Sequence, residues 1–186
     1  RYGVCIDAVY HLPATYALAS RWRDDAALAQ RAVAIAVDSM QVLRCETGWA
    51  QWFDPTHKRN NSVAWSRGLG WAVLGLLDLV RILGGEHTGE AAELAGEVLE
   101  LLAATQTEDG NWAEVLYHTP AGVETSTASF YVAAALHPAT ESLVAYLPFD
   151  GDASAHISEE TRGFIAKQIS LFRPGVPNAT TTVPKP

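Results

Sequence analysis

Apolar residues recur at helical spacing through most of the first 137 positions, and no stretch of useful length alternates with a period of two. The pattern therefore predicts an all-α domain. One expected helix is apolar on nearly every side, which indicates burial among other helices, and the next has a single apolar stripe beside a glutamate-rich face. This alternation predicts a barrel of helical hairpins with an inner and an outer ring. The expected helices cover residues 6–22, 25–44, 65–83, 89–105 and 124–136.

Proline, glycine and polar residues interrupt the helical pattern. Pro13 predicts a kink or a local break in the first helix. Long loops are expected over 45–63 and 106–123, where turn-forming residues gather. Beyond residue 137 the pattern changes, so we divide the chain into a partial domain over 1–137 and a divergent extension over 138–186. The extension is expected to contain a short helix and a disordered tail.

The composition narrows the classes of partner. Of 186 residues, 48% are hydrophobic and 18% are charged, as is ordinary for a globular domain. The formal net charge is −8 without any basic run, so we expect no nucleic-acid partner. No uninterrupted apolar run approaches the roughly 18 residues that span a bilayer, so we expect no membrane partner. An anionic substrate would need a local cationic group to hold it against this charge.

The cysteines and histidines indicate neither a disulfide framework nor metal chemistry. Cys5 and Cys45 lack metal-ligand spacing and are expected to be two buried free thiols. The six histidines are scattered along the chain. The chain starts without an initiator methionine or a signal peptide, which predicts that it begins within a longer protein or has been processed.

The segment Trp65-Ser66-Arg67-Gly68-Leu69-Gly70-Trp71 is the densest candidate site. Arg67 and Trp71 are four residues apart and share one helical face. A guanidinium group binds a carboxylate in bidentate fashion, and indoles stack on sugar faces, so the segment suits a sugar acid. The alternative is a packing cluster in which Arg67 pairs with a neighbouring acid.

Asp7 stands in an otherwise apolar stretch where the first helix begins. Two interpretations remain open. An aspartate at this position caps the helix by accepting hydrogen bonds from backbone amides. A carboxyl group in an apolar wall also holds its proton to a higher pH, which suits a general acid.

Aromatic and polar residues in the two long loops form a second set of candidates. The segment 48–57 clusters three aromatic residues, which either line a carbohydrate site or pack the loop onto the barrel. Trp112 lies in the second loop, and Glu124 and Ser126 stand at the start of the last helix. These two polar residues are expected to cap that helix or to contact a substrate at its rim.

The sequence resembles the unsaturated glucuronyl and rhamnogalacturonyl hydrolases of glycoside hydrolase families 88 and 105. The resemblance covers about residues 3–137 and rests on three blocks in the same order as in the family. They are Ile6-Asp7-Ala8-Val9-Tyr10 with Leu12-Pro13, Trp65-Ser66-Arg67-Gly68-Leu69-Gly70-Trp71, and Asp109-Gly110-Asn111-Trp112 with Glu124-Thr125-Ser126.

The resemblance implies an (α/α)6 toroid of twelve helices and hydration of the vinyl ether double bond of a terminal 4,5-unsaturated uronic acid, without a metal or an organic cofactor. Asp7 falls on the position of the family's general acid and base. The substrate is an unsaturated uronic-acid oligosaccharide made by a polysaccharide lyase, and cytoplasmic action is implied. The expected substrate-binding residues are Gln51, Trp65, Arg67, Trp71, Trp112 and Ser126.

The sequence departs from the family in three ways. The histidine that relatives place in the long loop is matched by Gln51, with His57 further along. A second aspartate of the family would lie upstream of the first residue, and 138–186 does not resemble the family's last helices. We therefore expect the C-terminal half of a toroid, whose open face exposes apolar surface and allows self-association.

Two other classes of function are alternatives to hydrolysis. The chain is alternatively a non-catalytic helical fragment or carbohydrate-binding module derived from such an enzyme. Another helical-toroid enzyme, such as a sugar epimerase, ranks last because histidine or glutamate pairs at a convincing spacing are not seen in the sequence.

Overall fold

The computed structural model describes residues 3–84 and 87–140. Each helix expected from the pattern is present there, with ends within about two residues of those expected. The part of the predicted extension that follows residue 140 lies outside the described residues. The helices are α1 (Ala8–Arg23), α2 (Ala26–Leu43), α3 (Ser66–Leu83), α4 (Gly89–Ala104) and α5 (Ser126–Ala135), with a 3-10 turn over Thr119–Ala121.

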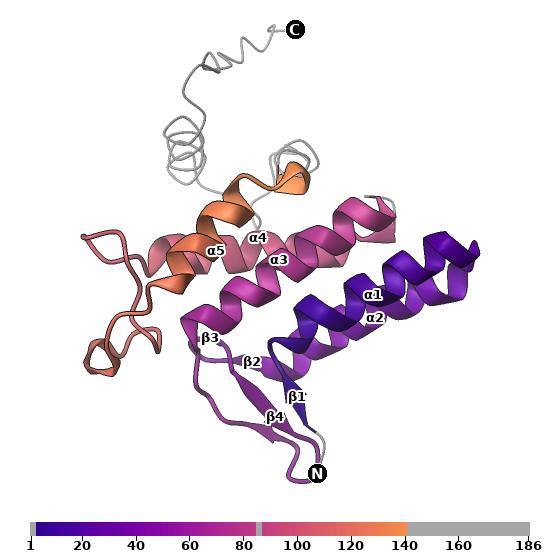
Figure 1. Cartoon of the computed structure of the whole chain (residues 1–186). Helices are drawn as coiled ribbons and strands as arrows, with labels where there is room; N and C mark the ends of the chain where they lie inside the picture. Colours follow the sequence, from indigo (N-terminus) through magenta and orange to yellow (C-terminus); the bar gives the residue numbers. More distant parts are fainter. Residues whose placement is uncertain (1–2, 85–86, 141–186) are drawn as a thin grey trace, which may run out of the picture.

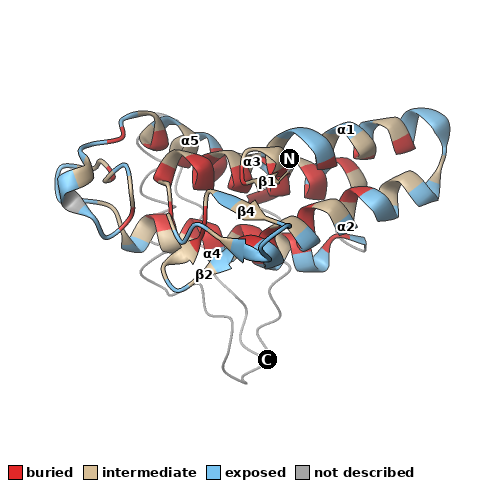
Figure 2. Cartoon of the chain, turned by 90° about the horizontal axis from the view of Figure 1, so that it is seen from below, coloured by how far each residue is buried: buried red, intermediate tan, exposed pale blue. Residues whose placement is uncertain are grey.

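The α-helices form two layers. Helix α1 packs against α2 and α3, and α3 packs against α4 and α5. Seen from below, α1, α3 and α5 lie on one side of the molecule and α2 and α4 on the other (Figure 2). Consecutive helices therefore alternate between an inner layer, formed by α1, α3 and α5, and an outer layer, formed by α2 and α4, as the predicted inner and outer rings require.

Helix α3 is the centre of the core, as its apolar composition predicted. Leu69, Val73, Leu76 and Leu77 are each fully buried. Gly75 makes the closest approach to α1, because a Cβ atom at this position would collide with the Val9 carbonyl oxygen and the Tyr10 Cα. Backbones can approach this closely only where a side chain is missing.

Pro13 removes a hydrogen bond from α1 at the place where Gly75 approaches it. Helix α1 runs through Pro13, so the break expected from the sequence is absent, and its ring is buried. Proline has no N–H group, so Val9, four residues earlier, loses the donor that its carbonyl would have in a regular helix. That same carbonyl faces Gly75 of α3. Gly75 of α3 thus lies against a carbonyl group that has no donor within α1.

The predicted loop 45–63 contains strands that the sequence pattern did not indicate. Strands β1 (Val4–Cys5), β4 (Trp52–Asp54) and β5 (Arg59–Asn60) pair in that order as an antiparallel sheet. Strands β2 (Arg44–Cys45) and β3 (Gly48–Trp49) pair separately. The strands lie beyond the N-terminal end of α1 (Figure 1). Each has only two or three residues, which is too short to show an alternating pattern.

Two surfaces of the α1–α2 hairpin bear on the predicted partners. Large apolar side chains of α1 are exposed, with Leu18 58% and Trp22 87% accessible. This agrees with an open apolar face, and self-association through it stays a prediction. Helix α2 is long and apolar enough to span a membrane by length and composition, but it packs on α1, and core helices meet the same criteria. The expected absence of a membrane partner also stays a prediction.

Candidate active site

Three helix starts meet at one end of the molecule. Helices α1, α3 and α5 run in the same direction, with their N-terminal ends on the side of the strands (Figure 1). The residues that precede them are Asp7, Trp65 and Thr125. Helix N-termini carry partial positive charge, so this end of the layer favours an anionic group. The fold thereby gathers residues from all three sequence blocks.

Arg67, in the first turn of α3, is held from two sides. Its Nη1 forms an ion pair with Oε2 of Glu124 at 2.9 Å, and its guanidinium carbon lies 4.2 Å from the centre of the Trp65 ring. The Glu124 side chain is 9% exposed, whereas that of Arg67 is 40% exposed. The neighbouring acid of the packing alternative is therefore present. The Arg67 side chain nevertheless stays partly open to solvent.

Glu124 also organises the start of α5. Its Oε1 accepts hydrogen bonds from the Ser126 amide at 3.0 Å and the Ser126 hydroxyl at 2.6 Å. The capping role expected for Glu124 is confirmed, and the Ser126 hydroxyl is engaged by it. Beside them, the buried Thr127 hydroxyl donates to the Ser66 hydroxyl at 3.0 Å, which fastens α5 to α3. This places Arg67 and Ser126 within one hydrogen-bonded unit.

Trp71 joins the three helices of the inner layer through aromatic contacts. Its ring centre lies 5.0 Å from that of Tyr10 on α1 and 4.4 Å from that of Phe130 on α5. His11 lies 6.0 Å away. Trp71 is half-buried one turn after Arg67, so one edge of the cluster stays accessible.

Asp7 occupies the N-cap position of α1 but does not cap it. Its backbone is helical, and its side chain forms no capping hydrogen bond among the described residues. Its Oδ2 instead accepts a hydrogen bond from the Cys5 thiol at 2.9 Å. The amide of the intervening residue, Ile6, donates to the Gln51 carbonyl at 3.0 Å, so Gln51 lies beside the Asp7 segment.

Cys5 is expected to alkylate slowly because of this arrangement. Both cysteines are free, as expected, but they are half-buried rather than buried, because both stand in short strands at the edge of the helix layers. Burial, and then the hydrogen bond to Asp7, raise the pKa of the Cys5 thiol, so it stays protonated at a pH where an ordinary thiol ionises. We expect iodoacetamide near pH 8 to label Cys5 several-fold more slowly than Cys45, measured by peptide mass spectrometry. If the labelling rate of Cys5 stopped rising with pH at the pKa of an ordinary thiol, this prediction would be wrong.

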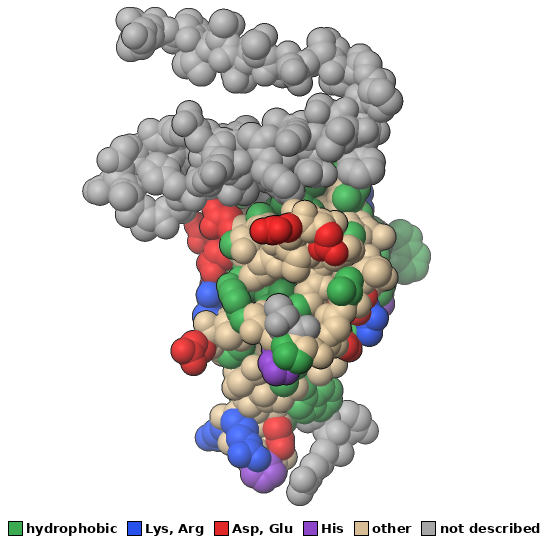
Figure 3. Space-filling view, turned by 90° about the vertical axis from the view of Figure 1, so that its left-hand side faces the viewer, with side chains coloured by type: hydrophobic (Ala, Val, Ile, Leu, Met, Phe, Trp, Pro, Cys, Tyr) green, Lys and Arg blue, Asp and Glu red, His purple; other side chains and the backbone are tan. Residues whose placement is uncertain are grey.

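Gln51 lies beside the Asp7 segment, whereas His57, the other candidate for the loop histidine, lies further away along the chain. His57 sits in the turn between β4 and β5, where its Nδ1 contacts Oδ2 of Asp54 at 2.6 Å. The hydrogen bond from His57 lowers the pKa of Asp54 to about 2. Figure 3 shows basic and histidine side chains gathered at that end of the molecule. The His57 side chain therefore lies in an exposed turn, where it contacts Asp54.

Trp112 does not have the open position that a sugar contact requires. Its side chain is 1% exposed, its indole N–H donates to the Leu102 carbonyl at 2.7 Å, and its ring packs against Tyr131. The assignment of Trp112 to substrate binding is corrected accordingly: its indole fills the core beneath the loop.

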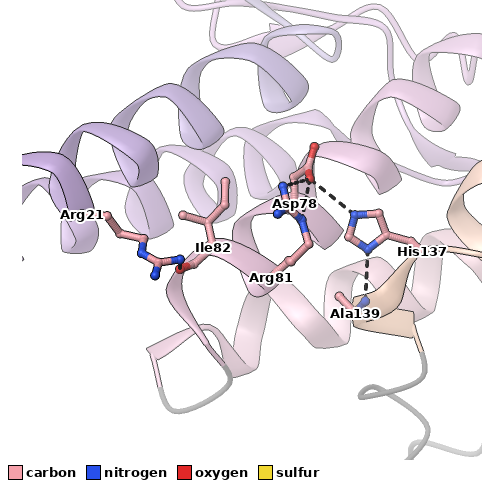
Figure 4. A network of polar contacts seen from close by, with 6 residues as sticks. All are labelled: Arg21, Asp78, Arg81, Ile82, His137 and Ala139. Atoms are coloured by element: carbon pink, nitrogen blue, oxygen red, sulfur yellow. Dashed lines mark hydrogen bonds and ion pairs between the residues drawn. The ribbon is translucent and has the colours of Figure 1, made fainter.

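A polar network that the sequence analysis did not identify lies towards the other end of α3 (Figure 4). Asp78 accepts hydrogen bonds from Arg81, at 2.8 and 3.2 Å, and contacts Nε2 of His137 at 3.4 Å. Arg21 of α1 donates to the Ile82 carbonyl at 3.4 Å. These contacts join the last turns of the helices and are structural.

One groove lies apart from these residues. It has a volume of about 490 Å³, is lined by alanine, valine and polar residues of α2 together with His87 and Glu90, and includes no expected site residue. Within residues 3–84 and 87–140, no three histidine, cysteine or acidic side chains are placed to hold a metal ion.

Comparison with known proteins identifies the family and the fold. Residues 48–145 match the model of Glycosyl Hydrolase Family 88. The structure is similar to that of a glycoside hydrolase of family 105 from C. acetobutylicum ATCC 824, with a TM-score of 0.66 and 19% identity, over 91% of this chain and 49% of that one. The chain thus spans about half the length of that enzyme, which agrees with the predicted half of an (α/α)6 toroid. No curated protein matches the chain.

Proposed function

The chain belongs to glycoside hydrolase family 88, and from this premise we propose that it releases terminal 4,5-unsaturated uronic acid from lyase-generated oligosaccharides. Family membership supports the reaction class. The position of Arg67 carries the proposal for this chain: it is held by Trp65 and Glu124 at the end of the helix layer where Asp7 also lies.

In the proposed reaction, Asp7 acts first as an acid and then as a base. Its carboxyl group donates a proton to C4 of the double bond, and positive charge develops at C5. Water then bonds to C5 as the Asp7 carboxylate takes its proton, which regenerates the acid. The resulting hemiketal opens and collapses to release the next sugar, so the anomeric carbon is not attacked directly. Neither a metal nor an organic cofactor takes part.

The Arg67 guanidinium is proposed to bind the carboxylate of the uronate. Trp65 holds the guanidinium plane on one side, and arginine binds a carboxylate with two parallel hydrogen bonds. Trp71, Gln51 and Ser126 are proposed to contact the sugar ring or its hydroxyl groups.

The function is tested by incubating the folded chain with lyase-generated unsaturated disaccharides and following the ultraviolet absorbance of the double bond. Loss of the absorbance together with release of the second sugar is expected. If the absorbance stays unchanged although the protein is folded, the non-catalytic module becomes the favoured function.

Replacing Arg67 with lysine is expected to raise KM about 10-fold with a smaller change in kcat. Lysine keeps the charge but loses the planar fork and its stacking on Trp65. Steady-state kinetics on the disaccharide measure both constants. A KM within about two-fold of wild type would remove Arg67 from carboxylate binding, since one bidentate pair contributes on the order of 1.4 kcal/mol, or about ten-fold.

Arg44→Lys is the matched control for this experiment. Arg44 also lies over an indole, that of Trp49 at 4.4 Å, and also pairs with a glutamate, Glu97 at 2.6 Å. It stands at the end of α2, in the outer layer. The same loss of stacking there is expected to leave KM unchanged.

A further inference from the structure

One tryptophan of the strand region is open, and the proposed reaction does not use it. Of the three aromatic residues in the 48–57 segment, Trp49 is 2% exposed and Phe53 is half-buried, whereas Trp52 is 41% exposed. The first two pack the segment onto the helices. Packing therefore does not account for the exposed indole of Trp52.

The strand register places Trp52 on the same sheet face as Cys5, whose thiol contacts Asp7. Trp52 of β4 stands directly opposite Cys5 of β1. Directly opposed residues in an antiparallel pair project to the same face, with Cβ atoms about 5 Å apart. The Cys5 thiol in turn contacts Oδ2 of Asp7 at 2.9 Å. Cys5 thus links the exposed indole to the proposed acid.

Gly3 fixes the direction of the indole. A Cβ atom on Gly3 would meet the Trp52 ring, with the indole Cε2 at 2.5 Å, so the ring rests against the Gly3 backbone. Gly3 and Cys5 are two residues apart in extended chain, which corresponds to about 7 Å. The ring therefore leans along β1 towards Gly3, away from the end of the strand that leads to Asp7. One side of the ring is supported and the remainder is open.

We propose that Trp52 is the stacking platform for the sugar that follows the unsaturated uronate in the substrate. This inference rests on the proposed function and assigns a group to the sugar beyond the cleaved bond. An indole selects a pyranose that presents its C–H face, and it offers nothing to a group without such a face. Trp52 is thus a specificity-determining residue rather than a catalytic one.

The test compares two substrates of the full chain: an unsaturated disaccharide and the methyl glycoside of the same unsaturated uronate. Trp52→Ala is expected to lower kcat/KM about 10-fold on the disaccharide and to stay within about two-fold on the methyl glycoside. Trp52→Phe, which keeps an aromatic face, is expected to recover most of the loss. Equal losses on both substrates, or no loss on the disaccharide, would overturn the assignment.

Trp22→Ala is the matched control, since Trp22 is 87% exposed on α1 and lies outside the site. If wild type hydrolyses neither substrate, the proposed function fails, and calorimetric binding of the disaccharide decides the inference separately. If Trp52→Ala weakens the affinity for the disaccharide and Trp22→Ala does not, the stacking role of Trp52 is supported. If the chain does not bind the disaccharide, or binds it equally well in Trp52→Ala, the stacking role is rejected.

Discussion

Asp7→Asn is expected to lower kcat on the unsaturated disaccharide at least about 100-fold, because general acid–base catalysis contributes about 10² to 10⁴ in rate. Asparagine has the shape of aspartate but can neither donate the proton to C4 nor accept one from water. Its amide oxygen can still accept the Cys5 hydrogen bond, so the local structure should persist. Initial rates and thermal unfolding measured on the same preparation separate the two effects.

Asp38→Asn serves as the control for this variant. Asp38 is exposed on α2 and belongs to the groove that contains no expected site residue. Its replacement is expected to leave kcat unchanged. If Asp7→Asn kept more than about half of the wild-type rate, another group would have to move the proton, and the assignment of Asp7 would be lost.

Gly75→Ala is expected to lower the free energy of unfolding by about 3 kcal/mol. The added methyl group would meet the Val9 carbonyl oxygen and the Tyr10 Cα, which are backbone atoms that no rotamer change can move. Helices α1 and α3 would have to separate, and the packing that aligns their N-terminal ends would loosen. Urea unfolding followed by circular dichroism measures the change.

Gly96→Ala is a control in another helix, and it is expected to change the free energy of unfolding in the opposite direction. Gly96 lies within α4, and a Cβ atom there would have no neighbour within 4 Å. Alanine is the better helix former, so this variant is expected to gain about 0.5–1 kcal/mol. Equal stabilities for the two variants would show that Gly75 does not hold α1 and α3 at close range.

The helices were predictable because their signals are local. Helix α3 was expected over 65–83 and is found at Ser66–Leu83. Its long apolar run predicts that the helix is buried, and the glycine that follows predicts where the helix ends. Asp25 caps α2 by accepting hydrogen bonds from the amides of Ala27 and Leu28, which follow it directly in the chain. Neither feature depends on residues distant in the chain.

Features that depend on distant residues could not be read from the sequence. Arg67 and Glu124 belong to different helices, so their ion pair requires the packing of α5 on α3. Trp112 showed the same limit, because a tryptophan in a polar loop has the same sequence signal whether its ring lies in the core or on the surface. The Cys5–Asp7 contact is local, but it requires the turn at the end of β1, which is too short to predict.

Hydration of the double bond is tested most directly by giving the chain two disaccharides that differ only in that bond. The proposed mechanism predicts that absorbance is lost in proportion to sugar released from the unsaturated disaccharide, and that the saturated one is left intact. Cleavage of both would contradict it, because it would require attack at the anomeric carbon by a pair of carboxyl groups. Cleavage of neither by folded protein would contradict the claim that this chain is a catalyst.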